Sequence, residues 1–414
     1  MSKFAKSLEA AENMKSAPKP PTPPRPGNIA LSTSVAQAKP ATKQVEPIDD
    51  ALSYPVAARI GVLGCGQAGG RIAQAFWSLG YRRVGVLNTT ENDFEGLASD
   101  MPKLSLDVGG ASKDMKLAKK VLADREADVR DLMFRSWGSG SLDCILICAG
   151  LGGGTGGGMG SSLISLARKH MVQTTGDDTR VGAVVSMPQP WEGQLTCRNA
   201  VQAFSEFMAA KISPLIVIDN ARVKSIYSSS MADLYPKANS VVAELFNVFN
   251  YYAANRKGLV TFDQSEFFQL LDSGIIVMGS SYIDPKKVSS PADVRSVIRD
   301  ELSNNVLSAC DLKRGKKGVC VFVTCPEVQQ TFSDDYLMSG FEQLDQLLGS
   351  GYTERPATVL HRGIYTGDDD SGIQCYTLIG DLEPPKDTLS KLARAGNVTA
   401  NSVSPNIASF LGID

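Results

Sequence analysis

Residues 150–160 read Gly-Leu-Gly-Gly-Gly-Thr-Gly-Gly-Gly-Met-Gly, with eight glycines in eleven positions, directly after the apolar run Leu142–Cys148. A segment with so few side chains cannot fill a core, and glycine loses the most conformational entropy on ordering. It can instead bring bare backbone N–H groups close to an anion, with Thr155 as the one hydroxyl. The helical pattern Ser161–Met171 follows, so this layout predicts a phosphate site at a helix N-terminus. A flexible linker is disfavoured, because linkers usually also carry serine, proline and charge.

The overall composition is that of an ordinary globular protein. The 414 residues are 43% hydrophobic and 21% charged, with a formal net charge of −2. This near-neutral balance gives no electrostatic reason to expect direct binding to nucleic acid. We expect no transmembrane segment, because no stretch approaches the apolar length that crosses a bilayer. The N-terminus lacks the apolar core of a signal peptide, so we expect a cytoplasmic protein.

The eight cysteines are scattered, and most lie in apolar, strand-like runs. Free cysteine behaves there as a small hydrophobe. Because the chain also has only two histidines, we expect no structural metal site.

Residues 1–55 differ from the rest of the chain. Ser16–Gly27 contains six prolines, and the stretch up to Tyr54 is rich in Ser, Thr, Ala, Lys and Gln. Such a composition cannot bury enough apolar surface to offset the entropy of ordering. We therefore expect a disordered, proline-rich N-terminal extension over residues 1–55, partly in polyproline II.

From residue 56 to residue 235, short and nearly continuous apolar runs alternate with helical patterns. Continuous runs rich in Val and Ile suit parallel strands that are buried on both faces. The pattern predicts a doubly wound, parallel α/β sheet whose ligand crevice lies at the carboxyl ends of the strands. The expected strands are Arg59–Leu63, Val84–Leu87, Leu142–Cys148, Val181–Met187 and Leu215–Ile218, and the expected helices are Arg71–Leu79, Lys113–Leu122, Ser161–Met171 and Leu195–Lys211.

A long helix and a second, smaller unit follow. We expect the helix over Pro236–Arg256, within a central segment 236–257, and a smaller α+β domain over residues 258–380. Two helices for four strands favour α+β over a second doubly wound sheet. From residue 381 to residue 414 the chain is expected to be a polar tail. The strands of the second unit are expected at Ile275–Met278, Val319–Thr324, Val359–Ile364 and Cys375–Leu378, and its helices near Pro291–Ala309 and Tyr336–Leu347.

The first strand leads into a second glycine-rich turn, Gly64-Cys65-Gly66-Gln67-Ala68-Gly69-Gly70. Its spacing is close to Gly-x-Gly-x-x-Gly, which favours an alternative, a Rossmann-type oxidoreductase with NAD. Two observations disfavour that alternative. The second strand ends in Asn88-Thr89-Thr90-Glu91, without an acid at its tip to hold a ribose. A dinucleotide fold also has no use for a second glycine loop at 150–160, whereas two such loops on neighbouring strands fit one triphosphate.

The two glycine motifs resemble the phosphate-binding signatures of the tubulin/FtsZ superfamily of GTPases, and in particular its prokaryotic members of the archaeal CetZ or the phage and plasmid tubulin-like type. Further motifs follow in family order. Gly110-Ala111-Ser112-Lys113-Asp114 resembles the loop that meets the terminal phosphate, and Met187–Gly193 resembles the loop that places an acid on the ribose. Leu215–Asn220 and Ala238-Asn239 resemble the two segments that read guanine.

The resemblance implies GTP or GDP as the bound nucleotide, with Mg²⁺. It makes 56–235 the GTP-binding domain and 258–380 the domain that activates hydrolysis. Asn220 and Asn239 would read guanine, Tyr235 would stack on the base, and a side chain at Gly154 would block the phosphates. No metal ligand is assigned, since Thr90 stands where an acid usually helps to hold Mg²⁺; Glu91 is an alternative for that acid. The implied nucleotide-binding residues are Gly64, Gly66, Gln67, Ala68, Gly69, Asn88, Gly110, Ala111, Gly152, Gly153, Gly154, Thr155, Gly156, Gly157, Glu192, Arg198, Asn220, Tyr235 and Asn239.

Gly258–Phe268 resembles the loop that such subunits insert into the nucleotide site of the neighbouring subunit, with Asp263 and Glu266 as its two carboxylates. A carboxylate can hold and polarise the attacking water, so the resemblance implies a catalytic role for both. The same two residues have the spacing of a capping box, with Asp263 as N-cap and Glu266 at the third helical position. The two interpretations are compatible, because a capped helix start also holds the carboxylates in place.

As a function, the resemblance implies a cytoskeletal protein that polymerises head to tail with itself and hydrolyses GTP at subunit junctions. A nucleotide-binding regulator that does not polymerise remains an alternative. Asn406–Leu411 weakly resembles the peptide that FtsZ uses to bind adaptor proteins. An adaptor at the N- or C-terminal tail and a C-terminal tail that docks on its own domain are both open.

Overall fold

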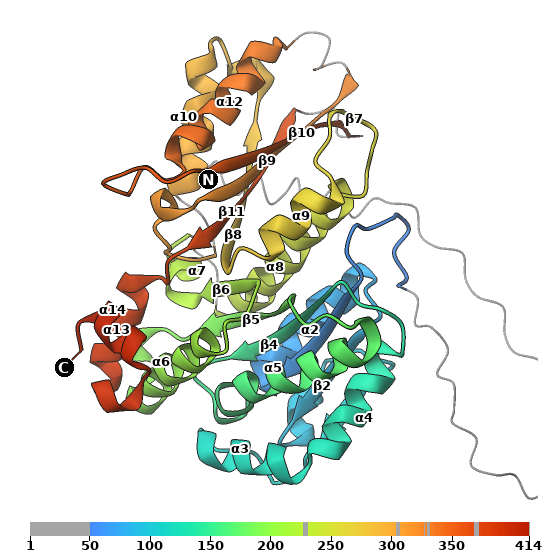
Figure 1. Cartoon of the computed structure of the whole chain (residues 1–414), viewed down its shortest axis with the longest axis vertical. Coiled ribbons are helices and arrows are strands. Elements are labelled where there is room, and N and C mark those ends of the chain that lie inside the picture. Colours follow the sequence, from blue (N-terminus) through green and yellow to red (C-terminus); the bar gives the residue numbers. More distant parts are fainter. Residues whose placement is uncertain are drawn as a thin grey trace, which may run out of the picture. The chain divides into compact units, whose positions relative to one another are not determined.

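The computed structural model describes residues 50–226, 231–303, 307–326, 328, 332–367 and 372–413. The expectations for residues 1–49, which include most of the proline-rich extension, lie outside the described residues. The described strands form one 11-stranded sheet, and helices pack against both of its faces (Figure 1). The expected fold class, a parallel α/β sheet followed by a smaller α+β part, is confirmed.

The N-terminal half of the sheet is entirely parallel, with the strand order β3-β2-β1-β4-β5-β6. Every residue of β1, β2 and β6 is buried, and β4 and β5 each have one partly buried residue, which explains their continuous apolar sequences. The strand order reverses between β1 and β4, and this is the point at which doubly wound sheets bind ligands. The six strands are β1 (Ile60–Cys65), β2 (Val84–Asn88), β3 (Lys103–Ser105), β4 (Cys144–Gly150), β5 (Val181–Met187) and β6 (Leu215–Asp219).

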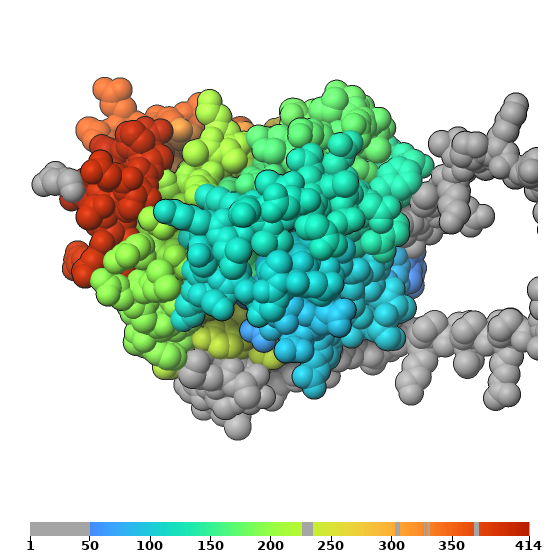
Figure 2. All heavy atoms as spheres, turned by 90° about the horizontal axis from the view of Figure 1, so that it is seen from below, coloured from blue at the N-terminus to red at the C-terminus, as the bar shows by residue number. Residues whose placement is uncertain are grey.

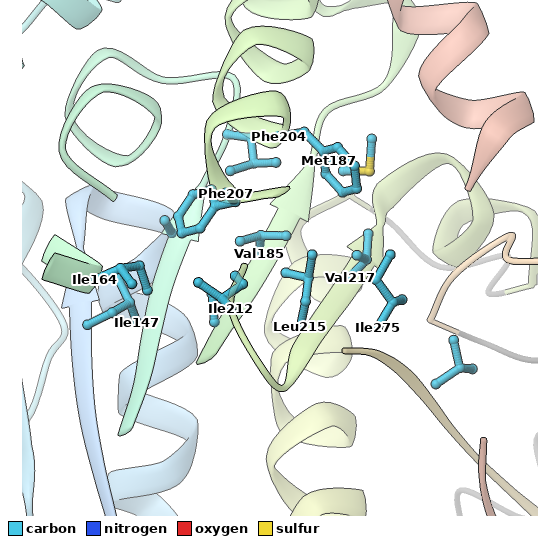
Figure 3. Packing of buried hydrophobic residues seen from close by; sticks show 14 of the residues in the cluster. Ile147, Ile164, Val185, Met187, Phe204, Phe207, Ile212, Leu215, Val217 and Ile275 are labelled. Carbon is cyan, nitrogen blue, oxygen red and sulfur yellow. The ribbon is translucent and has the colours of Figure 1, made fainter. Parts of the chain in front are cut away.

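Two layers of helices cover this parallel half. Alternate strand residues such as Ile147, Val185 and Val217 belong to one buried cluster with Phe204 and Phe207 (Figure 3), as the two-residue period of a strand requires. The helices on that face are α3 (Met115–Asp124), α4 (Glu126–Trp137), α5 (Gly154–Thr175) and α6 (Gln194–Ala209). The other face is covered by α2 (Gly66–Leu79) and α8 (Met231–Tyr252).

The C-terminal half of the sheet is mixed, in the order β8-β11-β9-β10-β7. Only β9 and β10 pair in parallel there. Two parallel pairs, Leu215 with Ile275 and Ile216 with Ile276, join it to β6. Its strands are β7 (Gly258–Val260), β8 (Ile275–Ile283), β9 (Lys317–Thr324), β10 (Val359–Thr366) and β11 (Ile373–Leu382), and its helices are α9 (Gln264–Leu271), α10 (Pro291–Ser303) and α12 (Asp334–Leu347), with α7 (Asn220–Ile226) preceding α8.

Three expected helix starts are wrong. Helix α2 begins at Gly66 instead of Arg71. The helix expected from Ser161 begins at Gly154, so most of the glycine segment is helical. A Cβ on Gly157 would lie 2.6 Å from the Leu151 carbonyl oxygen, so tight packing outweighs the low helix propensity of glycine. The central helix begins at Met231 instead of Pro236, which lies inside it.

The expectation of a polar tail from residue 381 is also wrong. Strand β11 continues to Leu382, and α13 (Lys386–Gly396) and α14 (Pro405–Leu411) follow. These helices pack beside α6, as the red and green residues in Figure 2 show. The Asn406–Leu411 motif lies in α14, and its residues Ile407 and Ala408 are buried. Of the two open alternatives for the C-terminal segment, docking on its own domain is the one observed.

A buried hydrogen bond joins α13 to the end of β6. The Thr388 hydroxyl donates to Oδ2 of Asp219, whose Oδ1 accepts from the backbone N–H groups of Ala221 and Arg222. Asp219 is only 1% exposed, so its carboxylate depends on these donors in place of water.

We therefore expect Thr388→Val to lower the free energy of unfolding by about 1–3 kcal/mol, because it leaves Asp219 Oδ2 without its side-chain donor. Denaturant unfolding measures the change. Thr388→Ser keeps the hydroxyl and serves as the control. Equal stability of the valine and serine variants would show that the C-terminal docking does not depend on this bond.

Candidate functional site

A cavity of about 830 Å³ lies where β1, β2, β4 and β5 end. Its volume falls within the roughly 300–1,000 Å³ that is usual for small-molecule sites. The residues expected to bind nucleotide that line it are Gly66, Gln67, Ala68, Gly110, Ala111, Gly152, Gly153, Gly154, Thr155, Gly156, Glu192, Asn220, Tyr235 and Asn239.

Two long helices begin at this cavity without caps. The N-cap residues of α2 and α5 are Cys65 and Gly153, and neither makes a side-chain capping bond. Neither helix has an acid in its first turn. The first N–H groups of each helix therefore keep free hydrogen-bonding capacity, and both helix dipoles add positive potential at the cavity. This arrangement favours an anion.

The first turns of α2 pack so closely against β1 and β4 that side chains would not fit at two of their glycines. A Cβ on Gly69 would lie 2.1 Å from the carbonyl oxygen of Cys148, and one on Gly64 would lie 2.7 Å from the carbonyl oxygen of Gly69. Gly64, Gly69 and Gly157 do not line the cavity, so their contribution is to let the backbone segments around it pack closely. Gly153 differs, because the nearest atom to its added Cβ is 3.9 Å away.

Behind the cavity, the end of β2 is held by polar contacts. Asn88 does not line the cavity; its Nδ2 donates to Oδ2 of Asp93 at 2.8 Å. The hydroxyls of Thr89 and Thr155 lie 2.8 Å apart and join the segment after β2 to the first turn of α5. Asp93 lines the cavity together with Thr90, whereas Glu91 does not. Asp93, which the sequence analysis missed, is thus the carboxylate on this side that can face a cation.

The loop before α3 brings a cation to the cavity. Lys113 donates from Nζ to Oγ1 of Thr196 at 2.8 Å, and both residues line the cavity. The backbone at Ser112 and Lys113 is left-handed, with φ of 46° and 64°, a conformation that costs energy for residues other than glycine. Asn199 stabilises it by donating from Nδ2 to the Lys113 carbonyl at 2.8 Å. Arg71 is a second cation in the lining that the sequence analysis missed.

The residues expected to contact the base and ribose share this cavity. Asn220 begins α7, while Tyr235 and Asn239 lie one turn apart on α8. The Tyr235 hydroxyl accepts a long bond, 3.4 Å, from Gln189 Nε2, and burial raises the pKa of Tyr235, so its hydroxyl stays neutral. Glu192 is held by its Oε1, which accepts from the Gln189 backbone N–H at 2.7 Å.

Two other groups near the site differ from the residues above in their position or protonation. Arg198 does not line the cavity; its Nε donates to the Gly396 carbonyl at 3.0 Å and so ties α6 to α13. Burial raises the pKa of the Cys65 thiol to about 12, so it is not a thiolate nucleophile at neutral pH.

Asp263 and Glu266 lie away from this cavity, at the start of α9. The expected capping box is present: Glu266 N donates to Asp263 Oδ1 at 2.9 Å, and Asp263 N donates to Glu266 Oε2 at 3.0 Å. Asp263 is exposed, and the Glu266 side chain is 30% exposed. Within one chain, these carboxylates are not part of the cavity lining.

The chain is similar in sequence to proteins of known families. Residues 59–228 match the Tubulin/FtsZ family, GTPase domain. The chain is 28% identical over 234 residues to the tubulin-like protein CetZ3 of Haloferax volcanii, which covers 52% of this chain and 58% of CetZ3. It is 24% identical over 210 residues to the cell division protein FtsZ of Porphyromonas gingivalis, which covers 50% of this chain and 42% of that protein. The chain thus spans about half the length of the curated relatives it matches.

Solved structures share the fold over most of the chain. A GTPγS-form protofilament of TubZ from Bacillus thuringiensis serovar israelensis has a TM-score of 0.68 at 20% identity, covering 83% of this chain and 92% of TubZ. A GTPγS-bound protofilament of CetZ2 from Haloferax volcanii has a TM-score of 0.65 at 20% identity, covering 82% and 98%. These structures show a shared fold, and the match of residues 59–228 to the GTPase-domain model confirms the resemblance to the tubulin/FtsZ superfamily.

Across the described part of the chain, no helix is long and apolar enough to cross a membrane.

The space around each glycine of the loop decides which substitution can test whether the cavity binds an anion. A Cβ on Gly154 would lie 2.9 Å from Lys113 Cα and from Asp114 N, so a side chain there also disturbs the loop. Gly153 has φ −85° and ψ 167°, which valine tolerates. We expect Gly153→Val to fold normally and to weaken nucleoside triphosphate binding at least about tenfold, or 1.4 kcal/mol, in titration calorimetry.

The matched control is Gly140→Val. No atom lies within 4 Å of a Cβ built on Gly140, and this glycine is not part of the cavity lining. It should bind like the unmodified protein. Unchanged affinity in a folded Gly153→Val variant would mean that phosphate does not approach this backbone.

Proposed function

We propose that this protein binds GTP with Mg²⁺, polymerises head to tail with itself, and hydrolyses GTP at the junctions between subunits. The observation that carries the proposal is the pair of uncapped N-termini of α2 and α5, which open into one cavity that Asn220, Tyr235 and Asn239 also line. A triphosphate supplies the negative charge that this end of the cavity favours. The amides of Asn220 and Asn239 and the ring of Tyr235 suit a purine base.

The amide side chains suit guanine. Each asparagine presents one acceptor and two donor hydrogens, and guanine carries both a carbonyl acceptor and N–H donors on one edge. A base that leaves these amides unpaired loses affinity, because an unsatisfied polar group in a site is costly. Tyr235, half-buried in the same cavity, offers an aromatic face for stacking.

The phosphates and Mg²⁺ would be held by the groups around the two glycine loops. Backbone N–H groups of α2 and α5 would bind phosphate oxygens, and Lys113 and Arg71 would balance charge. Mg²⁺ usually binds one or two carboxylates together with phosphate oxygens and water, and Asp93 with the Thr90 hydroxyl fits that set. The proposal places assembly in the cytoplasm, where GTP is available.

Hydrolysis would need a second subunit. Asp263 and Glu266 do not line the cavity of their own chain, yet their carboxylates reach solvent at the start of α9. A carboxylate near the terminal phosphate can orient the attacking water. The TubZ and CetZ2 structures with the same fold are protofilaments, which supports a junction that brings α9 of one subunit to the cavity of the next.

Base selectivity tests the nucleotide assignment. We expect GTP to displace ATP by a wide margin, and Asn239→Leu to weaken GTP binding by about 1–3 kcal/mol with little change for ATP. Competition binding with a fluorescent GTP analogue measures both effects. Equal affinity of the unmodified protein for GTP and ATP would contradict guanine recognition.

Glu266→Gln separates catalysis from capping. Glutamine can still accept the Asp263 N–H, so the capping box survives, while the carboxylate is lost. We expect this variant to bind GTP and assemble, with hydrolysis per assembled subunit reduced roughly 100-fold or more. Light scattering follows assembly and phosphate release follows hydrolysis.

The concentration dependence provides the control for that measurement. In the unmodified protein, turnover per subunit should rise with protein concentration and be negligible in dilute solution. Turnover that is independent of concentration would favour a regulator that does not polymerise, and normal hydrolysis in Glu266→Gln filaments would remove Glu266 from the reaction.

A further inference from the structure

Glu266 makes one contact that its capping box does not require. The box uses Oε2, which accepts the Asp263 N–H at 3.0 Å. The other oxygen, Oε1, lies 3.0 Å from Nδ1 of His361, and this contact is an ion pair when the imidazole is protonated. His361 lies on β10, so the contact joins two elements that are far apart in sequence.

The imidazole is more deeply buried than the carboxylate. His361 is 8% exposed, and its ring lies 6.5 Å from the ring of Phe262, centroid to centroid. Its Nε2 is buried and has no hydrogen-bond partner among the described residues. Of the two ring nitrogens, Nδ1 is therefore the one that contacts a polar group, and that group is the carboxylate of Glu266.

We propose that His361 is a positioning residue for Glu266, fixing the plane of this carboxylate for hydrolysis in the neighbouring subunit. The inference rests on the proposed function. A glutamate side chain has several rotatable bonds, and one contact at Oε2 leaves the carboxylate able to rotate. Contacts at both oxygens, from α9 and from β10, fix its plane. Each oxygen still has a lone pair for water, and the side chain stays partly exposed.

A positioning role of this kind affects the rate more than the binding of GTP. The cavity that would hold GTP is built from other residues, so loss of the His361 contact leaves nucleotide affinity intact. The capping box also persists, since its two bonds do not involve His361. The effect is confined to the orientation of one carboxylate, to which catalysis is sensitive.

The test compares two substitutions of similar size. His361→Asn can place an amide N–H₂ close to the position of Nδ1, whereas the longer His361→Gln carries its amide toward the position of Nε2. We expect hydrolysis per assembled subunit to stay within about threefold of the unmodified protein in His361→Asn and to fall about tenfold or more in His361→Gln. GTP affinity and the assembly threshold should be unchanged in both.

The matched control is the other histidine of the chain. His170 is equally buried, at 8% exposure, and its Nε2 also has no hydrogen-bond partner, but it lies on α5 beside Trp137. His170→Gln should hydrolyse GTP at the unmodified rate. A loss of rate equal to that of His361→Gln would assign the effect to general loosening of the core.

A double-substitution cycle separates this inference from the proposed function. In the Glu266→Gln background, His361→Gln should lower the rate no further, because the two residues act through one carboxylate. Suppose that Glu266→Gln abolishes hydrolysis. If His361→Asn and His361→Gln then both keep hydrolysis, both lose it or both fail to assemble, the positioning role is wrong and the proposed function stands. If Glu266→Gln hydrolyses normally, the proposed function itself fails.

Discussion

The whole site depends on two helix N-termini that meet at the edge of one parallel sheet. Helices α2 and α5 leave β1 and β4 on opposite faces, at the point where the strand order reverses. Their uncapped N–H groups and dipoles therefore converge on one cavity. The convergence depends on glycine where α2 passes β4: a Cβ on Gly69 would lie 2.1 Å from the Cys148 carbonyl oxygen. Glycine thus serves first to bring two backbones together and second to expose N–H groups.

The other features build on this frame. The Lys113 loop adds a positive charge next to the helix ends, held in a left-handed backbone by Asn199. On the β2 side, Asn88 holds Asp93 at the cavity. The C-terminal helices support the base side indirectly, because Thr388 donates to Asp219, the residue directly before Asn220. The carboxylates of α9 stand apart from all of these groups, which is the reason that the proposed reaction needs two subunits.

The sequence predicted the elements whose pattern is local. Strands β1, β4 and β5 are continuous apolar runs. Their positions agree with prediction because a strand that is buried on both faces needs apolar residues at successive positions. The start of α5 was missed, since glycine has a low helix propensity and only tertiary packing makes it helical here. The polar composition of residues 381–414 predicts a tail, although Leu389, Leu392 and Ala393 have the spacing of one buried helix face, which is the local signal for α13. The His361–Glu266 contact joins residues 95 positions apart, a pairing that no local pattern records.

Complementation between two defective subunits tests the central claim most directly. Gly153→Val is expected to lose the nucleotide site but to keep the carboxylates of α9. Glu266→Gln is expected to bind GTP and to lack the catalytic carboxylate. The GTP concentration is chosen to saturate Glu266→Gln but not Gly153→Val. If GTP in one subunit is hydrolysed by the next, each variant alone should release phosphate slowly, whereas a mixture that co-sediments should release it faster. Co-sedimentation of the two variants without faster phosphate release would contradict hydrolysis across the junction.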